Sequence, residues 1–378
     1  MNQKSISILG GGIAGLTTAI ALQKIGITAT IFEASKQILP VGAGLGLGSN
    51  ALMALREIDL QDEVTRAGHP MKRFSLYDES GSRITESSFE NRNRPTNVAI
   101  HRATLHEILL SKLDPNTIYT DKRLKDFTKT DTGIKLTFQD GSTHHTDYLI
   151  VADGIHSLVR QKLCASTPRY AGYTCWRCVI YTPLAAQLHP SETWGKNGRI
   201  GIVPLSDNII YWFACINAPM GDPTYKQFGI PELVNQFKNY HAPIPEILKL
   251  SKTENLIHND IMDLKPIPQY AYDRIALIGD AAHATTPNMA QGACQAIEDA
   301  VILANCISSN PNFELAFKDF EKKRLKRTHW ITETSWKIGK VAQLDNTFVI
   351  RLRNAAFRML PASMAERQLQ QLENVSFK

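Results

Sequence analysis

The sequence predicts an α/β fold with an inserted β-sheet layer and C-terminal helices. A glycine-rich turn separates an apolar strand from a helix at the start of the chain, and strand-like alternation dominates from about Pro168 to Gln269. Apolar residues at helical spacing then run from Phe313 to Leu372. At 378 residues the chain is long enough for one large α/β domain with a second layer, or for two domains.

The chain opens with a βαβ unit. Ser5 to Leu9 form a short apolar strand, and Ala14 to Ile25 carry apolar residues at helical spacing. Gly26 can end that helix, and Ala29 to Glu33 resume as a strand. Further apolar strands are expected at Tyr148 to Ala152 and at Arg274 to Ile278.

The change of pattern along the chain places the domain boundaries. We expect residues 1–167 and 270–345 to be two parts of one domain. Residues 168–269 would form the inserted sheet layer, with a helical segment near Pro231 to Tyr240, and residues 346–378 a helical tail.

The first turn has the spacing Gly10-x-Gly12-x-x-Gly15 between a strand and a helix. Gly10 permits a tight turn, Gly12 lets the backbone approach a pyrophosphate, and Gly15 lets helix and sheet pack closely. The phosphates would lie at the helix N-terminus, where free N–H groups favour negative charge. Glu33 ends the next strand and is placed to accept hydrogen bonds from an adenosine ribose. This is a Rossmann-like dinucleotide-binding fingerprint, which alone does not separate NAD from FAD.

Composition excludes several classes of protein. The net charge of +6 is mild for this length, and no apolar run approaches the roughly 18 residues of a membrane span. Residues 1–5 lead directly into a strand without the apolar core of a secretory signal. The six cysteines are scattered through apolar contexts, which favours thiols in a reducing compartment. We expect a cytoplasmic protein with no membrane span and no nucleic-acid partner.

Two features invite a function but have simpler interpretations. Residues 318–327 are strongly basic, and we expect the solvated face of a helix that buries Phe317, Phe320 and Leu325. Cys175 and Cys178 form a CxxC pair within a strand-like stretch, where positions three apart face opposite sides. No second pair exists to complete a zinc site, so we expect structural thiols and no bound metal.

Two later stretches decide the cofactor. Residues 148–160 read Tyr-Leu-Ile-Val-Ala-Asp-Gly-Ile-His-Ser-Leu-Val-Arg, and residues 275–292 read Ile-Ala-Leu-Ile-Gly-Asp-Ala-Ala-His-Ala-Thr-Thr-Pro-Asn-Met-Ala-Gln-Gly. With the glycine fingerprint, in this order and over most of the chain, they resemble the flavoprotein monooxygenases of the para-hydroxybenzoate hydroxylase family. The resemblance implies non-covalently bound FAD in the first domain and a substrate in the sheet layer.

The resemblance also implies roles for single residues. Asp280 would hydrogen-bond the ribityl chain of FAD, and Arg102 would contact the cofactor from the opposite side. Asp153 and Arg160 match a motif associated with both FAD and the nicotinamide cofactor, although either could simply support the fold. The residues expected to bind cofactor are Gly10, Gly12, Ile13, Ala14, Gly15, Glu33, Ala34, Gly44, Arg102, Leu124, Asp153, Arg160, Asp280, Pro287, Gln291, Gly292 and Ala293.

The segment from Pro287 to Gly292 precedes an apolar helix. Its N–H groups can therefore point at the N1 and C2 carbonyl edge of a flavin, where reduction places negative charge. The resemblance puts Pro287 beside the reactive flavin edge and His283 in the flavin-binding framework. Ala290 stands where the family has glycine, so we expect a slightly displaced loop. The glycine-rich residues 42–48 resemble the family's flavin-facing loop.

Arg199 and Tyr211 are the candidate substrate residues. They lie in strand-like stretches, at positions resembling the arginine and tyrosine of FAD-dependent urate hydroxylases. An arginine fork could hold an anionic or carbonyl-bearing ring, and a phenol could hydrogen-bond its polar edge. Alternatively, both side chains are satisfied within the sheet. With Pro287, they form the expected catalytic set.

The resemblance implies a monooxygenase in which NADH or NADPH reduces FAD and O2 forms a C4a-hydroperoxyflavin. One oxygen atom would then pass to a small aromatic or heteroaromatic substrate. Alternatives are an epoxidase, an enzyme that modifies an antibiotic of the tetracycline type, or a non-catalytic flavin sensor. The Trp-x-Trp-x-Ile-Pro motif of flavin halogenases does not occur. We expect a monomer or a homodimer.

Overall fold

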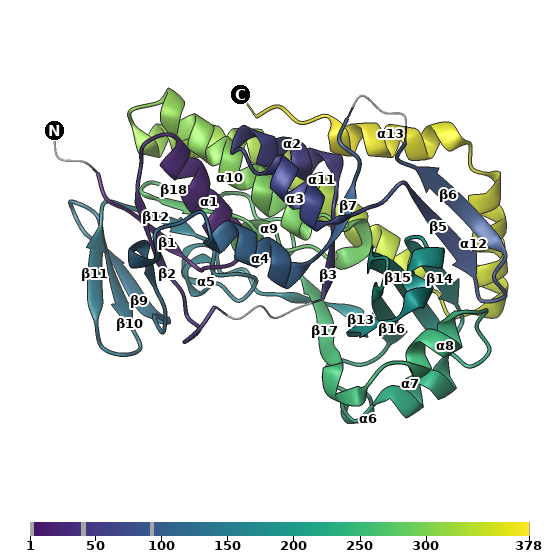
Figure 1. Cartoon of the computed structure of the whole chain (residues 1–378). Coiled ribbons are helices and arrows are strands. Elements are labelled where there is room, and N and C mark those ends of the chain that lie inside the picture. Colours follow the sequence, from purple (N-terminus) through teal and green to yellow (C-terminus); the bar gives the residue numbers. More distant parts are fainter. Residues whose placement is uncertain (1–3, 39–42, 91–93, 378) are drawn as a thin grey trace.

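The computed structural model describes residues 4–38, 43–90 and 94–377, with only the backbone for 362–365. Two bodies lie side by side: a six-stranded sheet with its helices, and a seven-stranded sheet with smaller helices on its far side (Figure 1). This agrees with the predicted α/β class, the sheet layer and the helical C-terminal region.

The six-stranded sheet has the order β18-β19-β12-β1-β2-β8. Its strands are parallel apart from β18, which pairs antiparallel with β19. The inner strands are continuous apolar runs, as expected for a parallel sheet covered on both faces. The bounds are β1 Ile6–Leu9, β2 Ala29–Phe32, β8 Ile118–Tyr119, β12 Tyr148–Val151, β18 Ala271–Tyr272 and β19 Ile275–Leu277.

Helices α1 (Ile13–Lys24) and α10 (Gly292–Ser309) pack against each other beside this sheet. A three-stranded sheet adds to the same hydrophobic core, with Phe138 packed on Phe32 of β2 at 4.9 Å between ring centroids. Its strands are β9 Leu124–Lys129, β10 Ile134–Phe138 and β11 Thr143–Thr146. The other elements of this body are α2 Ser49–Glu57, α3 Gln61–Ala67, α4 Arg102–Leu110, α5 Leu158–Cys164, α9 Asp280–His283, β3 Gly44–Leu47, β4 His69–Pro70 and β7 Val98–His101.

The seven-stranded sheet has the order β17-β13-β16-β15-β14-β5-β6. Two of its strands come from a part of the chain that the sequence pattern assigned to the first domain. The expected boundaries of 168 and 269 therefore enclose five of its strands, but not β5 and β6. The bounds are β5 Arg73–Asp78, β6 Arg83–Ser88, β13 Arg169–Tyr181, β14 Ser191–Gly195, β15 Gly198–Ser206, β16 Ile209–Asn217 and β17 Ile257–Asp263.

The two faces of this sheet have different partners. Trp176 and Cys178 belong to a core shared with α7 (Ile230–Gln236) and α8 (Ile244–Lys249), next to the short α6 (Pro223–Lys226). Cys175 belongs to a separate cluster on the opposite face. The CxxC cysteines thus face opposite sides, as their spacing predicts, and all six cysteines are free thiols.

The last helices are α11 (Phe313–Ala342), α12 (Thr347–Met359) and α13 (Ala362–Glu373). Helix α11 packs on α10 and β18 and runs on toward the seven-stranded sheet (Figure 1). Phe317 and Phe320 are buried as predicted, but the basic run is not wholly solvated. Arg324 is fully buried because it lies four residues after Phe320, on the same helix face.

In the described part of the chain, no helix combines the length and the apolar character that crossing a membrane requires. Short 3-10 turns occur at Pro115–Thr117, Pro183–Gln187, Thr253–Asn255 and Pro287–Met289.

Candidate active site

The glycine turn is built as its spacing predicts. Gly10 has φ of +100°, and a Cβ there would meet the Ala152 carbonyl oxygen at 2.3 Å. A Cβ on Gly15 would meet the Gly10 carbonyl oxygen at 1.9 Å, so only glycine lets α1 approach β1 this closely. A Cβ on Gly12 would have no neighbour within 4 Å, which leaves open space at the turn.

That open space adjoins the N-terminus of α1. No side chain caps the first turn, which holds Ile13, Ala14 and Gly15 and has no acidic residue. The free N–H groups and the helix dipole therefore form a site for an anion such as a pyrophosphate. A Cβ on Gly279 would be 2.9 Å from the Ala14 Cβ. The glycine turn and the later Gly-Asp motif are therefore neighbours.

Glu33 lies at the end of β2 beside Ala34. Its two carboxylate oxygens accept hydrogen bonds of 2.7 Å from the Gly11 and Ser35 N–H groups. A carboxylate has about four acceptor positions, so Glu33 keeps capacity for ribose hydroxyls. Leu124, at the start of β9, is half-buried and packs on the first core.

Asp153 and Asp280 follow β12 and β19 at the carboxyl edge of the sheet, where ligands bind in folds of this kind. Burial raises the pKa of Asp153 to about 6, and one of its carboxylate oxygens has no hydrogen-bond partner. Burial also raises the pKa of Asp280, whose side chain nevertheless touches solvent. A carboxylate surrounded by protein yet open to water lines a cleft.

Arg102 faces the same cleft. It begins α4, its backbone N–H donates to the Ala43 carbonyl oxygen at 3.1 Å, and its charge lowers the pKa of Asp280 against the effect of burial. Arg160 behaves differently from the expected cofactor contact. It is fully buried and donates to the carbonyls of Ile155, Ser166 and Ala281, so it supports the backbone around both Gly-Asp motifs.

The Pro287–Gly292 segment forms a short turn followed by α10. Pro287 and Ala290 are exposed, and Ala290 adopts the left-handed conformation with φ of 51°, the conformation that a glycine at this place would favour. No side chain caps α10, whose first turn begins at Gly292 and Ala293. The Gln291 side chain is buried, and its Oε1 accepts hydrogen bonds from Asn50 at 3.0 Å and Gln295 at 2.8 Å.

Gly44 and Gly46 lie in β3, which pairs with β7, while Gly42 falls outside the described residues. A Cβ on Gly46 would be 3.5 Å from the Ala290 Cβ. A Cβ on Gly44 would meet the Tyr211 ring at 2.5 Å. The glycine-rich segment therefore lies between the turn before α10 and Tyr211 of the seven-stranded sheet.

A buried ion network supports this turn from behind. Arg324 donates to Glu298 and to Asp299, each at 2.6 Å, and Arg327 donates to both Glu298 oxygens at 2.7 Å. Asp299 also accepts from the Gly279 N–H and pairs with His283, which places His283 in the framework. The sequence interpretation missed both arginines, although the helical spacing from Phe320 was a usable signal.

Arg199 joins the sheet layer to the α10 turn. Its guanidinium donates to Glu192 at 2.8 Å and to the Asn288 amide oxygen at 2.5 Å, and Asn288 also accepts from Tyr173 at 3.2 Å. Arg199 is buried and its charge is paired with Glu192, while its Nε has no hydrogen-bond partner in the described part of the chain.

Arg177 is a further cation on the same face, and the sequence interpretation did not single it out. It interacts with the Tyr211 hydroxyl, and Cys175 and Tyr211 raise its pKa above the ordinary value, so it stays charged. Within the described residues, no carboxylate forms an ion pair with it. Strand alternation from Cys175 could have placed it on this face.

Tyr211 is surrounded by apolar side chains. They belong to one cluster that joins the sheet layer to β7 and β3. Its members are Ala43, Met71, Ala99, Val179, Val203, Leu205, Ile209, Tyr211 and Phe213.

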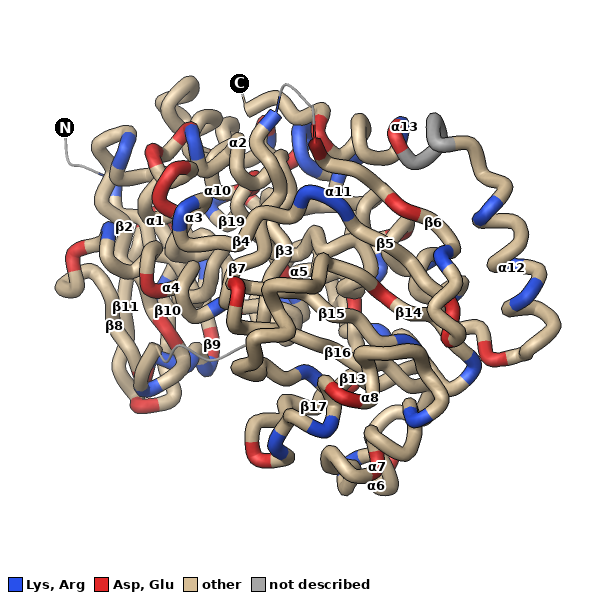
Figure 2. Tube along the Cα trace, turned by 45° about the vertical axis from the view of Figure 1, so that its right-hand side comes forward, with Lys and Arg blue, Asp and Glu red and all other residues tan. Residues whose placement is uncertain are grey.

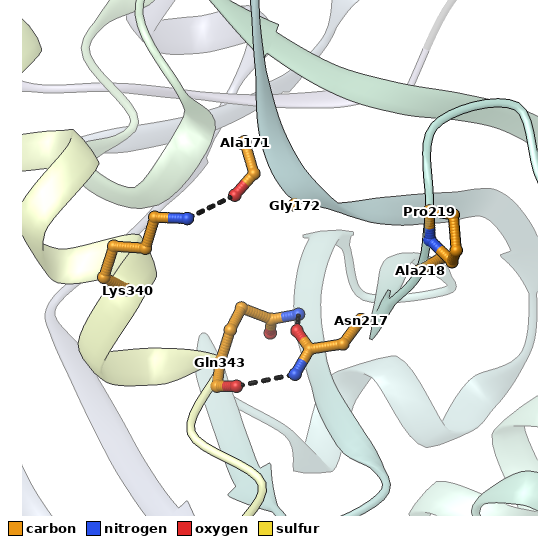
Figure 3. A pocket seen from close by; sticks show the side chains of 7 residues that line it. All are labelled: Ala171, Gly172, Asn217, Ala218, Pro219, Lys340 and Gln343. Atoms are coloured by element: carbon orange, nitrogen blue, oxygen red, sulfur yellow. Dashed lines mark hydrogen bonds between the residues drawn. The ribbon is translucent and has the colours of Figure 1, made fainter.

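A separate cavity of about 460 Å³ lies between β13, the end of β16 and α11 (Figure 3). Lys340 donates to the Ala171 carbonyl oxygen at 3.0 Å, and Gln343 and Asn217 exchange hydrogen bonds at its wall. None of the sequence-predicted site residues lines it.

Residues 3–311 match the family model described as an FAD binding domain. The chain belongs to this family. It is 33% identical over 367 residues to an aurachin C monooxygenase/isomerase of Stigmatella aurantiaca, with 96% of each chain covered. It is 32% identical over 376 residues to a 2-heptyl-3-hydroxy-4(1H)-quinolone synthase of Pseudomonas aeruginosa, with 97% of each covered. The chain is an FAD-dependent monooxygenase.

Among solved structures, Klebsiella pneumoniae HpxO complexed with FAD and uric acid has a TM-score of 0.88 and 24% identity over 97% of this chain and 96% of that one. The fold is shared. The residues present fit FAD: two uncapped helix N-termini, the open space at Gly12 and a carboxylate in the cleft.

Proposed function

We propose that this FAD-dependent monooxygenase hydroxylates a nitrogen heteroaromatic ring of the 4-quinolone type that carries an apolar chain. NADH or NADPH is the reductant and O2 the oxygen source. The observation that carries the proposal is Arg177, a charged guanidinium without a carboxylate partner in the described chain, beside Tyr211 in an apolar cluster.

A cation and a phenol together suit a ring with a carbonyl oxygen. The guanidinium donates to the oxygen, and hydrogen bonds to a charged group contribute more than neutral ones, about 1.5–3 kcal/mol. Around Tyr211 the side chains of Val203, Leu205 and Phe213 are apolar. They favour an alkyl or prenyl substituent over a ring that is polar on every edge.

The relatives support the same substrate class. The Pseudomonas aeruginosa protein is named for a 4(1H)-quinolone with a heptyl chain and a 3-hydroxyl group. The similarity to it extends over nearly the whole chain, sheet layer included. We therefore place hydroxylation on the heteroaromatic ring and not on the chain.

In this proposal each residue group has a task. The first turn of α1 and Glu33 hold the adenosine and pyrophosphate of FAD, and Asp280 and Arg102 hold its central part. The turn at Pro287 and the N-terminus of α10 face the flavin edge. Bound FAD supplies the oxygen-transfer chemistry. Arg177 and Tyr211 orient the ring, and Arg199 fixes the sheet layer to the turn through Asn288.

The test is a substrate panel of 2-heptyl-4(1H)-quinolone, unsubstituted 4(1H)-quinolone, urate and salicylate. We expect the alkylquinolone to stimulate NAD(P)H oxidation most strongly and to gain one oxygen atom by mass. An enzyme that turns over urate and ignores both quinolones would contradict the proposal.

The variant Arg177→Met tests the residue that carries the proposal. Losing a charged hydrogen bond of about 1.5–3 kcal/mol should raise KM for the quinolone roughly 10- to 100-fold. Arg56→Met, at an exposed arginine of α2, is the matched control and should leave KM unchanged. An unchanged KM in Arg177→Met would remove Arg177 from the site.

A urate-like substrate is the second candidate, favoured by the Arg199 and Tyr211 pair. The paired charge of Arg199 counts against it, because Glu192 and Asn288 already bond to two of its three nitrogens. Free thiols throughout favour the cytoplasm as the compartment. We also propose that the chain is a monomer or a homodimer, and analytical ultracentrifugation distinguishes the two.

A further inference from the structure

Helix α12 presents a stripe of large apolar side chains to solvent. Phe348, Leu352 and Met359 have exposed fractions of 69%, 55% and 83%. They follow one another at spacings of four and seven residues and therefore form one stripe along the helix. Val349 and Leu360 extend it, and the exposed Ala355 fills the gap.

The side of α12 that faces the protein is mixed: Ile350 is buried and Phe357 packs on the Trp194 ring, with 5.9 Å between ring centroids. Arg353 and Asn354 are buried, and Arg353 donates to Asn354 and to the Val341 carbonyl oxygen at 3.1 Å. The Arg353 guanidinium also lies over the Trp194 ring, 5.0 Å from its centroid. These contacts fix the rotation of the helix, so the outward position of the apolar stripe is set by specific hydrogen bonds.

The charges on α12 are all positive. Its thirteen residues include Arg351, Arg353 and Arg358 and no aspartate or glutamate. Figure 2 shows blue segments and no red segment along this helix. Arg358 is paired with Asp78 at 2.7 Å, whereas Arg351 is exposed and has no ion pair with any residue in the described ranges.

We propose that the α12 stripe of Phe348, Leu352 and Met359, with Arg351 at its flank, docks on an anionic lipid bilayer surface. An amphipathic helix with an apolar face and cationic flanks lies in the plane of such an interface. The cytoplasmic leaflet carries negative lipids that attract basic residues. The helix lies on the bilayer and does not cross it.

A second copy of the chain fits the α12 stripe less well than an anionic bilayer does. A two-fold contact through this stripe would bring Arg351 of one copy toward the same patch of the other, and α12 has no acid to pair with either. An anionic surface instead complements every exposed charge on the helix.

The experiment is co-sedimentation of the FAD-loaded enzyme with extruded vesicles. We expect about fivefold stronger binding to phosphatidylcholine vesicles containing about 30 mol% phosphatidylglycerol than to pure phosphatidylcholine vesicles, because one unpaired arginine near an anionic surface contributes about 1 kcal/mol. The triple variant F348S/L352S/M359S should lose at least about tenfold of this binding, and R351E should lose the preference for phosphatidylglycerol.

The matched control is Y181S/M220S, which removes two apolar side chains that are 79% and 65% exposed elsewhere on the surface. It should bind vesicles as the unchanged enzyme does. Quinolone-stimulated NAD(P)H oxidation in detergent-free buffer shows that each variant is folded and active. Far-UV circular dichroism of each variant tests folding independently of the substrate.

Two results would overturn the proposal. One is vesicle binding that is absent in the unchanged enzyme, or equal in the unchanged enzyme and the triple variant. The other is a dimer in analytical ultracentrifugation that the triple variant dissociates, since the stripe would then be an interface between two copies.

Discussion

Replacing Arg324 with methionine should be among the most destabilising single substitutions in the protein. Methionine keeps much of the side-chain volume but leaves Glu298 and Asp299 buried with fewer partners. Arg327 still bonds Glu298, and His283 and the Gly279 N–H still bond Asp299. Removing one partner of a buried ion pair costs about 3–5 kcal/mol, and we expect this range for the free energy of unfolding.

The cost should depend on pH. Burial raises the pKa of Glu298 and of Asp299, but Arg324 with Arg327 or His283 outweighs it, so both pKa values lie below their ordinary ones. Groups with a lowered folded pKa contribute stability above their unfolded pKa and lose it as pH falls through the folded one. Without Arg324 both pKa values rise, so the deficit of the variant should be full at pH 7 and shrink as the pH falls below the ordinary carboxyl pKa of about 4.

Urea denaturation of the FAD-free and FAD-loaded proteins measures both effects. Lys322→Met on the same helix is the control, because Lys322 forms an exposed pair with Asp319 that contributes at most about 1 kcal/mol. FAD affinity should also fall, since the network fixes Gly279 and the turn before α10. A deficit below about 1 kcal/mol at pH 7, or one that stays constant as the pH falls from 7 to about 3, would refute the reasoning.

Four further substitutions test the cofactor side. Ala290→Gly should stabilise the protein by about 1 kcal/mol in denaturation, because glycine adopts the left-handed conformation without strain; a loss of stability would contradict this. Gly15→Ala should lower both FAD affinity and Tm, because its Cβ meets a backbone oxygen at 1.9 Å. Gly12→Ala should weaken FAD binding and leave Tm unchanged. An equal loss of Tm in Gly12→Ala and Gly15→Ala would contradict this reasoning. In FAD-free protein, stability should fall by about 3 kcal/mol as pH rises from about 4 to 6 through the raised pKa of Asp153, and Asp153→Asn should lack this fall.

Much of the cofactor side could be predicted because its signals are local. The glycine spacing of residues 10–15 specifies one strand, one turn and one helix without reference to the rest of the chain. The Gly-Asp motifs at 153 and 279 follow apolar strands, and parallel strands bring such ends to one edge of a sheet.

Pairing between distant strands was not predictable in the same way. β5 and β6 are short, and their residue pattern does not indicate that β5 pairs with β14. The partners of Arg324 and Arg199 are likewise set by tertiary packing. Helical spacing could show that Arg324 faces inward, but not that Glu298 and Asp299 meet it there.

The roles of single site residues divide along the same line. Sequence similarity pointed to Arg199, and the structure shows that Glu192 and Asn288 already occupy it. Arg177 lies two positions after Cys175 on the same strand face, yet only the folded sheet shows that it has Tyr211 beside it and no carboxylate.

The seven-stranded sheet takes its strands from two separate stretches of the chain, residues 73–88 and 169–263. The backbone therefore enters and leaves this sheet at each of the two stretches. Transplanting a new specificity as a single cassette at residues 168–269 would leave the two edge strands of the host behind. Recombination between relatives of this enzyme must exchange both stretches together to preserve the β14–β5 pairing.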